Sequence, residues 1–425
     1  MENYSIVLSI LAIIIFLAVF AERVKLPYPV LLIVAGIGLG CIPSLPHIEL
    51  NPEIVLLIFL PPLLYDAAFN IRFDEFRTHL HTIGTLAIGL VFLTATGIAV
   101  IARYCIPGMD WPLSFVLGAI LSATDAVAAI GITKGLGLSH KTNTILEGES
   151  LVNDASALIA YRFAVAAVTG IAFVLWKAAL QFVIVMGGGI LMGMAMAKLL
   201  AFILVRVRNN NLVVISYMLL MPFVTYVVAE AVHVSGVIAV VILGLGIARF
   251  SRKVFPESLR HQSSSIWEII IFLLNGLIFI LMGLQFPYVI KNITPEQFWP
   301  YIGYAFLITV VALALRMTRV FMQRANLARA FVSQRGRITE NALLDVKTSL
   351  IIGWSGMRGI VSLAIAIGLP LTLQDGSPFP MRNDIIFISI AVVLFTLIGQ
   401  GLTLPWLVKV LNKVPEQEAT ATAAS

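Results

Sequence analysis

The chain has 425 residues, of which 60% are hydrophobic and 12% are charged, and its mean hydropathy is +0.99. Because a soluble domain is about 25% charged, this composition excludes an ordinary soluble protein and indicates an all-α membrane protein that crosses the bilayer many times. The net charge of +6 indicates orientation in the membrane rather than nucleic-acid binding, and two cysteines are too few for a disulfide scaffold or a cysteine metal site. We expect membrane lipid around the chain, no nucleic-acid partner and no cofactor.

Hydrophobic segments follow one another along the chain, and each is expected to cross the membrane, which takes about 20 apolar residues. The thirteen segments are 4–22, 28–43, 52–70, 80–104, 112–133, 144–170, 174–204, 212–230, 234–250, 265–286, 298–320, 347–370 and 384–411. Together they form one transmembrane domain over residues 1–411. It contains two blocks of six segments, about 4–170 and 212–411, and the segment 174–204 joins them. A short cytoplasmic tail, 412–425, follows.

The basic residues predict how the segments are oriented. With the N-terminus outside, 22 of the 28 basic residues, including Arg316, are assigned to cytoplasmic loops and the tail, which agrees with the positive-inside rule. Only Arg162 and Arg358 are then left within the spans. We therefore expect a multi-pass protein of the cell membrane, either a bacterial inner membrane or a plasma membrane, with a cytoplasmic C-terminus.

Two segments carry polar or glycine-rich interruptions at membrane depth. Residues 122–125 read Ser-Ala-Thr-Asp, and residues 353–359 contain three glycines and an arginine. Each interruption lies in the second-to-last segment of its six-segment block, and the single joining segment gives the two blocks opposite orientations. This pattern is typical of inverted repeats with paired discontinuous helices. Asp125 can neutralise exposed helix N-termini at such a crossing, or it can simply cap a helix break.

The stretch 147–159, EGESLVNDASALI, places Glu147, Glu149 and Asp154 inside an expected span. A charged side chain at the bilayer centre costs about 3 kcal/mol, so these carboxylates indicate a buried ion pair, an ion-binding site or both. Ser150 and Asp154 are four residues apart and share a helix face.

The other face of the same helix carries Glu149 and Asn153, which are also four residues apart. Glu149 is therefore directed toward a neighbouring helix. The obvious partner is Arg358, and this pair would connect the two repeats.

Asp66 is a further carboxylate within a span, and it follows the double proline Pro61-Pro62. The prolines leave backbone carbonyls without helical partners, and these carbonyls can bind a cation. Alternatively, the prolines only kink the helix. Asp66 and Asp154 together offer hard oxygen ligands for a monovalent cation. Such a carboxylate holds either a proton or a cation, so competition combined with alternating access is sufficient for exchange. Glu230 is either a vestibule carboxylate or a residue at headgroup level.

Five stretches of this chain carry a family resemblance: FLPPLLYDA (59–67), SATDAVAA (122–129), EGESLVNDASAL (147–158), AEAVHVSGVIAVVILG (229–244) and GMRGIVSLA (356–364). In this order and combination they resemble the sodium/proton exchangers of the monovalent cation:proton antiporter class that carry an Asn-Asp motif. The resemblance covers nearly the whole chain. It implies a homodimer of thirteen-helix subunits, each with a dimerisation domain and a six-helix core.

The resemblance also implies roles for individual residues. It implies that the ion contacts Asp154, Asp66, Ser150 and the backbone carbonyl of Thr124. It implies that Asn153 orients the site, that Asp125 compensates helix ends and that Glu149 pairs with Arg358. Asn153 in place of a second aspartate resembles the electroneutral members, which exchange one cation per proton. The chain departs from many relatives at Ala126, where they have proline, and from some at Asp66, where they have glutamate.

The function predicted from the sequence is secondary active transport rather than enzymatic catalysis. Sodium or lithium would exchange for protons by competition at Asp154, with a core that moves like an elevator. A potassium/proton antiporter of the same fold remains an alternative, because selectivity depends on cavity size and ligand geometry. An ion channel is a further alternative. An intramembrane aspartyl protease is excluded because the Gly-x-Gly-Asp motif that should partner Tyr65-Asp66 is absent.

Overall fold

The computed structural model describes residues 11–20, 28–42, 52–71, 73–133, 136, 138–169, 175–291, 293–333, 342–373 and 375–413. The expected outer N-terminus and almost all of the expected tail 412–425 lie outside these residues. Within them the chain is helical, and the only extended pairing is one bridge between Thr372 and Pro378. The all-α fold expected from the sequence is confirmed.

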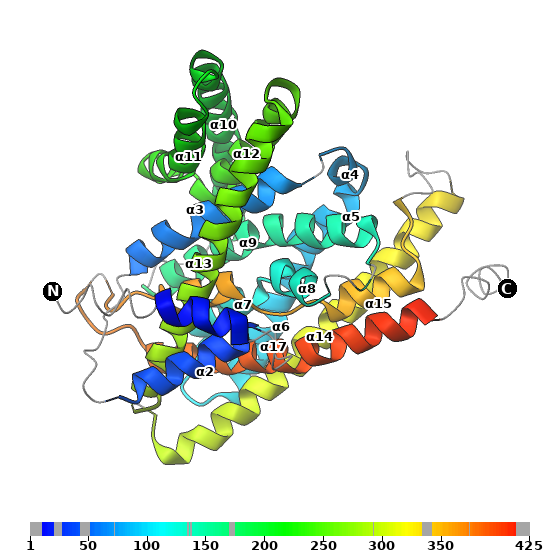
Figure 1. Ribbon diagram of the computed structural model, residues 1–425. Coiled ribbons are helices and arrows are strands. Elements are labelled where there is room, and N and C mark those ends of the chain that lie inside the picture. The colour runs from blue at the N-terminus through cyan, green and yellow to red at the C-terminus, as the bar shows by residue number, and fades with distance from the viewer. Residues whose placement is uncertain are drawn as a thin grey trace.

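The helices follow the chain order of the expected segments (Figure 1). Residues 11–20 are helical, and the further elements are α2 (Tyr28–Gly40), α3 (Pro52–Asn70), α4 (Phe73–Thr78), α5 (Leu80–Gly84), the π-helical η1 (Thr85–Leu90), α6 (Val91–Cys105), α7 (Trp111–Ser122), α8 (Ala126–Thr133), α9 (His140–Val168), α10 (Leu175–Val207), α11 (Asn211–Ala231), α12 (Gly236–Val254), α13 (Glu257–Lys291), α14 (Pro295–Val332), α15 (Val346–Trp354), α16 (Ile360–Ile367) and α17 (Arg382–Lys413). Each expected segment corresponds to one helix or to consecutive helices.

Within the described residues, seven helical stretches are long and apolar enough to cross a membrane. They are Leu80–Cys105, His140–Val168, Leu180–Val207, Asn211–Ala231, Glu257–Lys291, Pro295–Val332 and Arg382–Asn412. The helices α2, α3 and α7 are shorter apolar helices. The structure therefore has the helical content of a polytopic membrane protein.

Short polar side chains begin several of these helices. The carboxylate of Asp110 accepts the backbone N–H of Leu113 at 2.9 Å, at the start of α7. Ser139 does the same for α9 and Ser235 for α12. N-caps of this kind satisfy backbone donors that have no partner within the helix, so the starts of these helices are encoded locally.

Small residues allow the closest packing of helices far apart in the sequence. The helix α2 packs along α13, and a Cβ atom on Gly36 would lie 2.9 Å from the Cα of Gly283. Backbones that approach this closely are typical of membrane helix pairs. The helices α10, α11 and α12 stand together at one end of the molecule (Figure 1), and α12 also packs against α3.

Both interruptions expected from the sequence are real breaks in helices. Residues 123–125 separate α7 from α8, and residues 355–359 separate α15 from α16. The two breaks lie against each other, because the backbone N–H of Asp125 donates to the carbonyl oxygen of Met357 at 2.8 Å. The expected pair of crossing discontinuous helices is therefore confirmed.

Candidate ion-binding site

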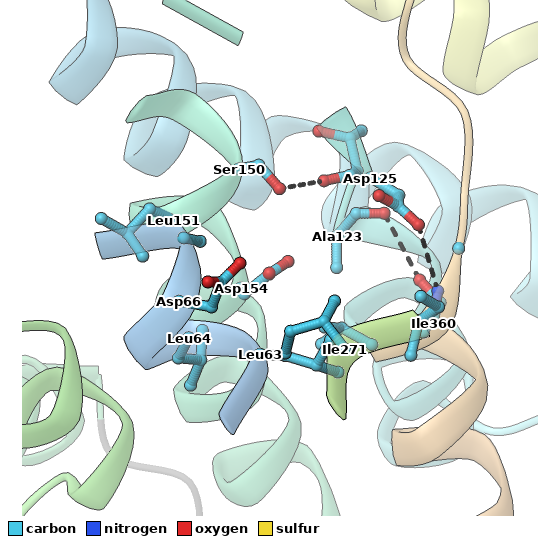
Figure 2. Close-up of a pocket in the computed structure, with 15 residues that line it drawn as sticks. Leu63, Leu64, Asp66, Ala123, Asp125, Ser150, Leu151, Asp154, Ile271 and Ile360 are labelled. Carbon is cyan, nitrogen blue, oxygen red and sulfur yellow. Dashed lines mark hydrogen bonds between the residues drawn. The ribbon is translucent and has the colours of Figure 1, made fainter. Parts of the chain in front are cut away.

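A cavity of about 100 Å³ lies beside the crossing of the two broken helices (Figure 2). Its walls come from α3, α9 and α13 and from the breaks of both discontinuous helices. Its polar lining consists of Asp66, Thr124, Asp125, Ser150, Asp154 and Ser362. Five of these six were singled out from the sequence, where they lie up to 88 positions apart. The fold thus brings the candidate ligands together around one small space.

Thr124 and Ser150 form one wall of the cavity. The hydroxyl of Ser150 donates to the carbonyl oxygen of Thr124 at 3.0 Å and accepts the backbone N–H of Ala126 at 3.4 Å. Because Thr124 lies in a helix break, its carbonyl oxygen has no place in a helical ladder and remains free to accept. Asp154 lies one turn beyond Ser150 on the same face of α9, as its spacing predicted.

Asp66 approaches the same cavity from α3. Asp66 and Asp154 both line this space (Figure 2). Asn70, one turn further along α3, donates to Asp66 Oδ1 at 3.0 Å. Within the described residues no group of three or more His, Cys, Asp or Glu side chains could hold a metal ion. The oxygen set is two carboxylates, a hydroxyl and a backbone carbonyl, which suits a weakly bound cation of low charge.

Asp125 lies between the N-termini of the two half-helices that meet at the crossing. Its Oδ1 accepts the backbone N–H of Ala128 in α8 at 3.1 Å, and its Oδ2 accepts that of Ile360 in α16 at 3.4 Å. A carboxylate in this position balances the partial positive charge of both helix ends. Gly359 makes the approach possible, because any Cβ atom there would overlap the Asp125 carboxylate.

Arg358 lies at the C-terminal ends of the half-helices α7 and α15. Its Nε donates to the carbonyl oxygen of Leu121 at 2.9 Å, near the C-terminus of α7. Its Nη1 donates to the carbonyl oxygen of Gly356 at 2.6 Å, just after α15. A cation among C-terminal carbonyls balances their partial negative charge. Asp125 and Arg358 therefore compensate the two signs of helix-end charge at one crossing.

The partner of Glu149 differs from the one expected. Glu149 forms an ion pair with Arg316 of α14, and Arg316 Nη2 donates to Glu149 Oε2 at 3.0 Å. The expected Glu149–Arg358 pair is wrong, because Glu149 pairs with Arg316, and the Arg358 side chain donates to the backbone carbonyls of Leu121 and Gly356. The orientation count placed Arg316 among loop and tail residues, whereas it lies within α14 and its side chain is buried. Its position inside the expected segment 298–320 was the signal that could have revealed it.

Asn153 lies behind the cavity wall rather than on the cavity. Its Nδ2 donates to Thr124 Oγ1 at 2.6 Å, and Thr124 Oγ1 in turn donates to Glu149 Oε1 at 3.3 Å. Arg316 Nη1 completes this group by donating to the same carboxylate oxygen. The side chains of Asn153, Glu149 and Arg316 thus hold Thr124, whose carbonyl faces Ser150.

Glu230 does not line the cavity. Its Oε1 accepts Arg162 Nη2 at 2.9 Å and the backbone N–H of Gly236 at 3.0 Å. The side chains of Arg162 and Glu230 are 41% and 28% exposed. The pair joins the end of α9 to the end of α11, a contact that sequence spacing could not indicate.

The whole chain can be compared with known proteins. Residues 7–410 match the family described as "Sodium/hydrogen exchanger, transmembrane". The chain belongs to this family. The resemblance noted in the sequence is therefore confirmed, and the family is one of transporters rather than enzymes.

Individual relatives agree with this placement. The chain is 35% identical over 421 residues to a sodium, potassium, lithium and rubidium/H(+) antiporter of Bacillus pumilus (strain SAFR-032), and the match covers 96% of this chain and 61% of the relative. It is 34% identical over 422 residues to an uncharacterized Na(+)/H(+) exchanger of Mycobacterium tuberculosis (strain ATCC 25618 / H37Rv), covering 98% of this chain and 76% of that protein. The chain thus spans about three fifths to three quarters of the length of these relatives.

A solved structure shares the fold. The sodium proton antiporter MjNhaP1 from Methanocaldococcus jannaschii superimposes with a TM-score of 0.72 at 20% sequence identity, covering 95% of this chain and 100% of that chain. This likeness supports the polytopic helical architecture described above.

Proposed function

We propose that this exchanger-family chain carries monovalent cations and protons in opposite directions across the cell membrane. The proposal rests on the small cavity beside the two crossing helix breaks. Asp154, Asp66, Ser150 and Thr124 line it, and the Ser150 hydroxyl donates to the backbone carbonyl of Thr124. Binding sites of secondary transporters lie at such breaks, where backbone ends and carboxylates can replace the hydration shell of an ion.

The mechanism rests on competition for one carboxylate. Asp154 binds a cation when ionised and releases it when protonated, so each form of the site carries one species. The hydroxyl of Ser150 and the carbonyl of Thr124 supply neutral oxygen ligands beside it. Because Asn153 is a neutral amide bonded to Thr124 rather than a second carboxylate on the cavity, we propose a stoichiometry of one cation per proton, which moves no net charge.

Sodium, with lithium, is the proposed cation, and potassium is the second candidate. The Bacillus pumilus relative is named for sodium, potassium, lithium and rubidium together, which keeps potassium open for this chain. Asp66 extends into the cavity from α3 and accepts a hydrogen bond from Asn70. The length of this side chain therefore limits how closely the ligands can surround an ion. Selectivity of this kind depends on cavity size and ligand geometry.

Alternating access completes the proposal. The helices of the two breaks and α9 would form a moving core, and α3 with α10–α13 would form a static part that also carries the contact with a second subunit in a homodimer. Asp154 and Ser150 then belong to the core and Asp66 to the static part. The Arg162–Glu230 pair links α9 to α11, and we expect it to break when the core moves like an elevator. An ion channel would instead need one continuous open path.

The test uses purified protein in liposomes that contain a pH-sensitive dye. A sodium gradient and then a potassium gradient is imposed, with and without valinomycin and potassium to clamp the voltage. A sodium-driven pH change that the clamp does not alter would establish electroneutral sodium/proton exchange, and a response to potassium alone would favour the second candidate. A current without coupled proton movement would favour a channel. Asp154→Asn should abolish exchange, whereas Glu296→Gln, at an exposed position of α14, should not.

A further inference from the structure

A second cavity, of about 270 Å³, lies where α3, α12 and α13 meet, apart from the ion-binding cavity. α3 packs against both of the other helices (Figure 1). The polar lining of this cavity includes Arg252 and Arg260 together with Ser251, Ser264 and Asn70. Its volume is close to that of the smaller ligand pockets of proteins, about 300 Å³.

One arginine N–H donor among the residues that line this cavity lacks a hydrogen-bond acceptor. The Nε of Arg260 is buried and has no hydrogen-bond partner among the described residues. Arg252 gives one N–H to the carbonyl oxygen of Ile71 at 2.8 Å, and each guanidinium carries five N–H donors. A buried guanidinium donor without an acceptor is costly. The guanidinium of Arg260 therefore lacks one acceptor within the described residues, and that of Arg252 lines the same cavity.

The charges around the cavity favour an anion over a cation. Two guanidinium groups line it, and the one lining carboxylate, Glu257, lies 3.6 Å from His261 Nε2. The side chains of Glu257 and His261 are nearly four-fifths exposed, and Arg252 is also exposed, so all three stand at the rim. Arg260 is partly buried. Arginine guanidinium groups match the oxygens of a phosphate group in a bidentate manner. Basic pockets between membrane helices on the cytoplasmic side bind lipid phosphates, and the positive-inside rule places this basic end there.

We propose that this cavity binds a phosphate group, held by Arg252 and Arg260 with the hydroxyls of Ser251 and Ser264. The phosphate comes from a membrane lipid headgroup or from a soluble phosphate. In either case its oxygens accept from the guanidinium groups of Arg252 and Arg260, which line the cavity. This site lies outside the ion-binding cavity and uses none of its ligands.

One hydrogen bond connects the two cavities. Asn70 lines the phosphate cavity and donates to Asp66, which lines the ion cavity. A phosphate that accepts from the Asn70 amide, which has two N–H donors, changes how firmly the same amide holds Asp66. This consequence rests on the proposed cation exchange, whereas phosphate binding itself does not.

Binding is tested on the purified full chain by its thermal unfolding midpoint. Phosphatidic acid is titrated in parallel with diacylglycerol of the same acyl chains, which differs only by lacking the phosphate, and inorganic phosphate is titrated against chloride at equal ionic strength. We expect phosphatidic acid, inorganic phosphate or both to raise the midpoint by several degrees, and diacylglycerol to leave it unchanged. Protection by phosphatidic acid alone identifies a lipid as the source, and protection by both identifies a site open to soluble phosphate. No protection by either overturns the proposal.

Variants locate the site. Arg260→Gln and Arg252→Gln should each weaken the apparent phosphate affinity about tenfold or more, as expected for a lost charge-assisted hydrogen bond. Lys253→Gln removes the same charge from an exposed neighbour that does not line the cavity, and it should bind like the wild type. Equal weakening by Lys253→Gln and Arg260→Gln would show diffuse attraction and would overturn the proposal. If one arginine variant does not fold, the other gives the same comparison.

The coupling has a separate readout. In liposomes, phosphate or phosphatidic acid should shift the apparent KM for sodium of the wild type, and Asn70→Ala should remove this shift while phosphate still protects against heat. Protection without any exchange activity would refute the proposed function and leave the phosphate site standing. Exchange activity without protection by phosphate would refute the phosphate site and leave the proposed function standing.

Discussion

Glu149 of α9 and Arg316 of α14 form a buried ion pair 167 positions apart in the sequence, with Arg316 Nη2 3.0 Å from Glu149 Oε2. Their side chains are 1% and 2% exposed. The same carboxylate accepts Thr124 Oγ1, so the pair supports the residue whose carbonyl faces the ion cavity. An ion pair this deep is costly to break from one side, because the remaining charge loses its partner.

The first prediction follows from this pair. Arg316→Gln and Glu149→Gln should each destabilise the protein by about 3–5 kcal/mol, while the double variant should cost less than the sum, because it leaves no unpaired charge. Unfolding midpoints of the single and double variants measure the coupling. The matched cycle uses Glu149→Gln with Arg358→Gln. A coupling as large in that cycle as with Arg316 would contradict the pairing in the structure.

A second prediction concerns the ion ligands. Asp66→Glu lengthens a ligand that reaches the cavity from α3, so it should change the ratio of apparent KM values for sodium and potassium while exchange continues. Asp66→Asn removes the charge and should raise the apparent KM for both ions. Proton flux in liposomes under each gradient gives these values. Unchanged KM values in both variants would remove Asp66 from the site.

The pH dependence of exchange follows from competition at Asp154. Protons occupy the carboxylate at low pH, so the apparent KM for sodium should fall as pH rises. At high pH protons become scarce on the return step, so the exchange rate should pass through a maximum and decline. Initial rates at a series of pH values, equal on both sides of the membrane and over a range of sodium concentrations, check both trends. A KM that rises with pH would be incompatible with one shared site.

A fourth prediction tests the crossing of the broken helices. Gly359→Ala would place a methyl group against the Asp125 carboxylate, which accepts the backbone N–H groups of Ala128 and Ile360. We expect a lowered unfolding midpoint and loss of exchange. Gly131→Ala in α8 is the control, because nothing lies within 4 Å of the added atom there. Similar midpoints for both variants would show that the crossing has more room than the structure indicates.

The last prediction concerns Arg162 and Glu230. Cysteines at both positions, in a chain whose Cys41 and Cys105 are replaced by serine, should react with a short bifunctional methanethiosulfonate. Because the proposed elevator movement separates α9 from α11, the cross-link should stop exchange, and reduction should restore it. A single-cysteine variant treated with the same reagent is the control. Full exchange in the cross-linked protein would exclude relative movement of these two helix ends.

The sequence by itself determined the class of protein and most of the ion cavity. Carboxylates are too costly in a bilayer to occur without a role, which marked Asp66 and Asp154 directly. The motif at 122–125 and the glycines at 353–359 predicted both helix breaks, because they conflict with a regular helix. The i, i+4 spacing placed Ser150 with Asp154 and Glu149 with Asn153, since that relationship lies within one helix.

Only the tertiary structure decided which partners meet across helices. Arg358 was the partner expected for Glu149, but spacing along the chain carries no information on which distant helix packs against α9. The orientation rule assigned Arg316 to the cytoplasm, whereas packing of α14 places its side chain inside the protein. The Arg162–Glu230 contact and the second cavity, between α3, α12 and α13, likewise depend on helix ends brought together in space. Local patterns specify which residues need a partner, and the packing of whole helices supplies it.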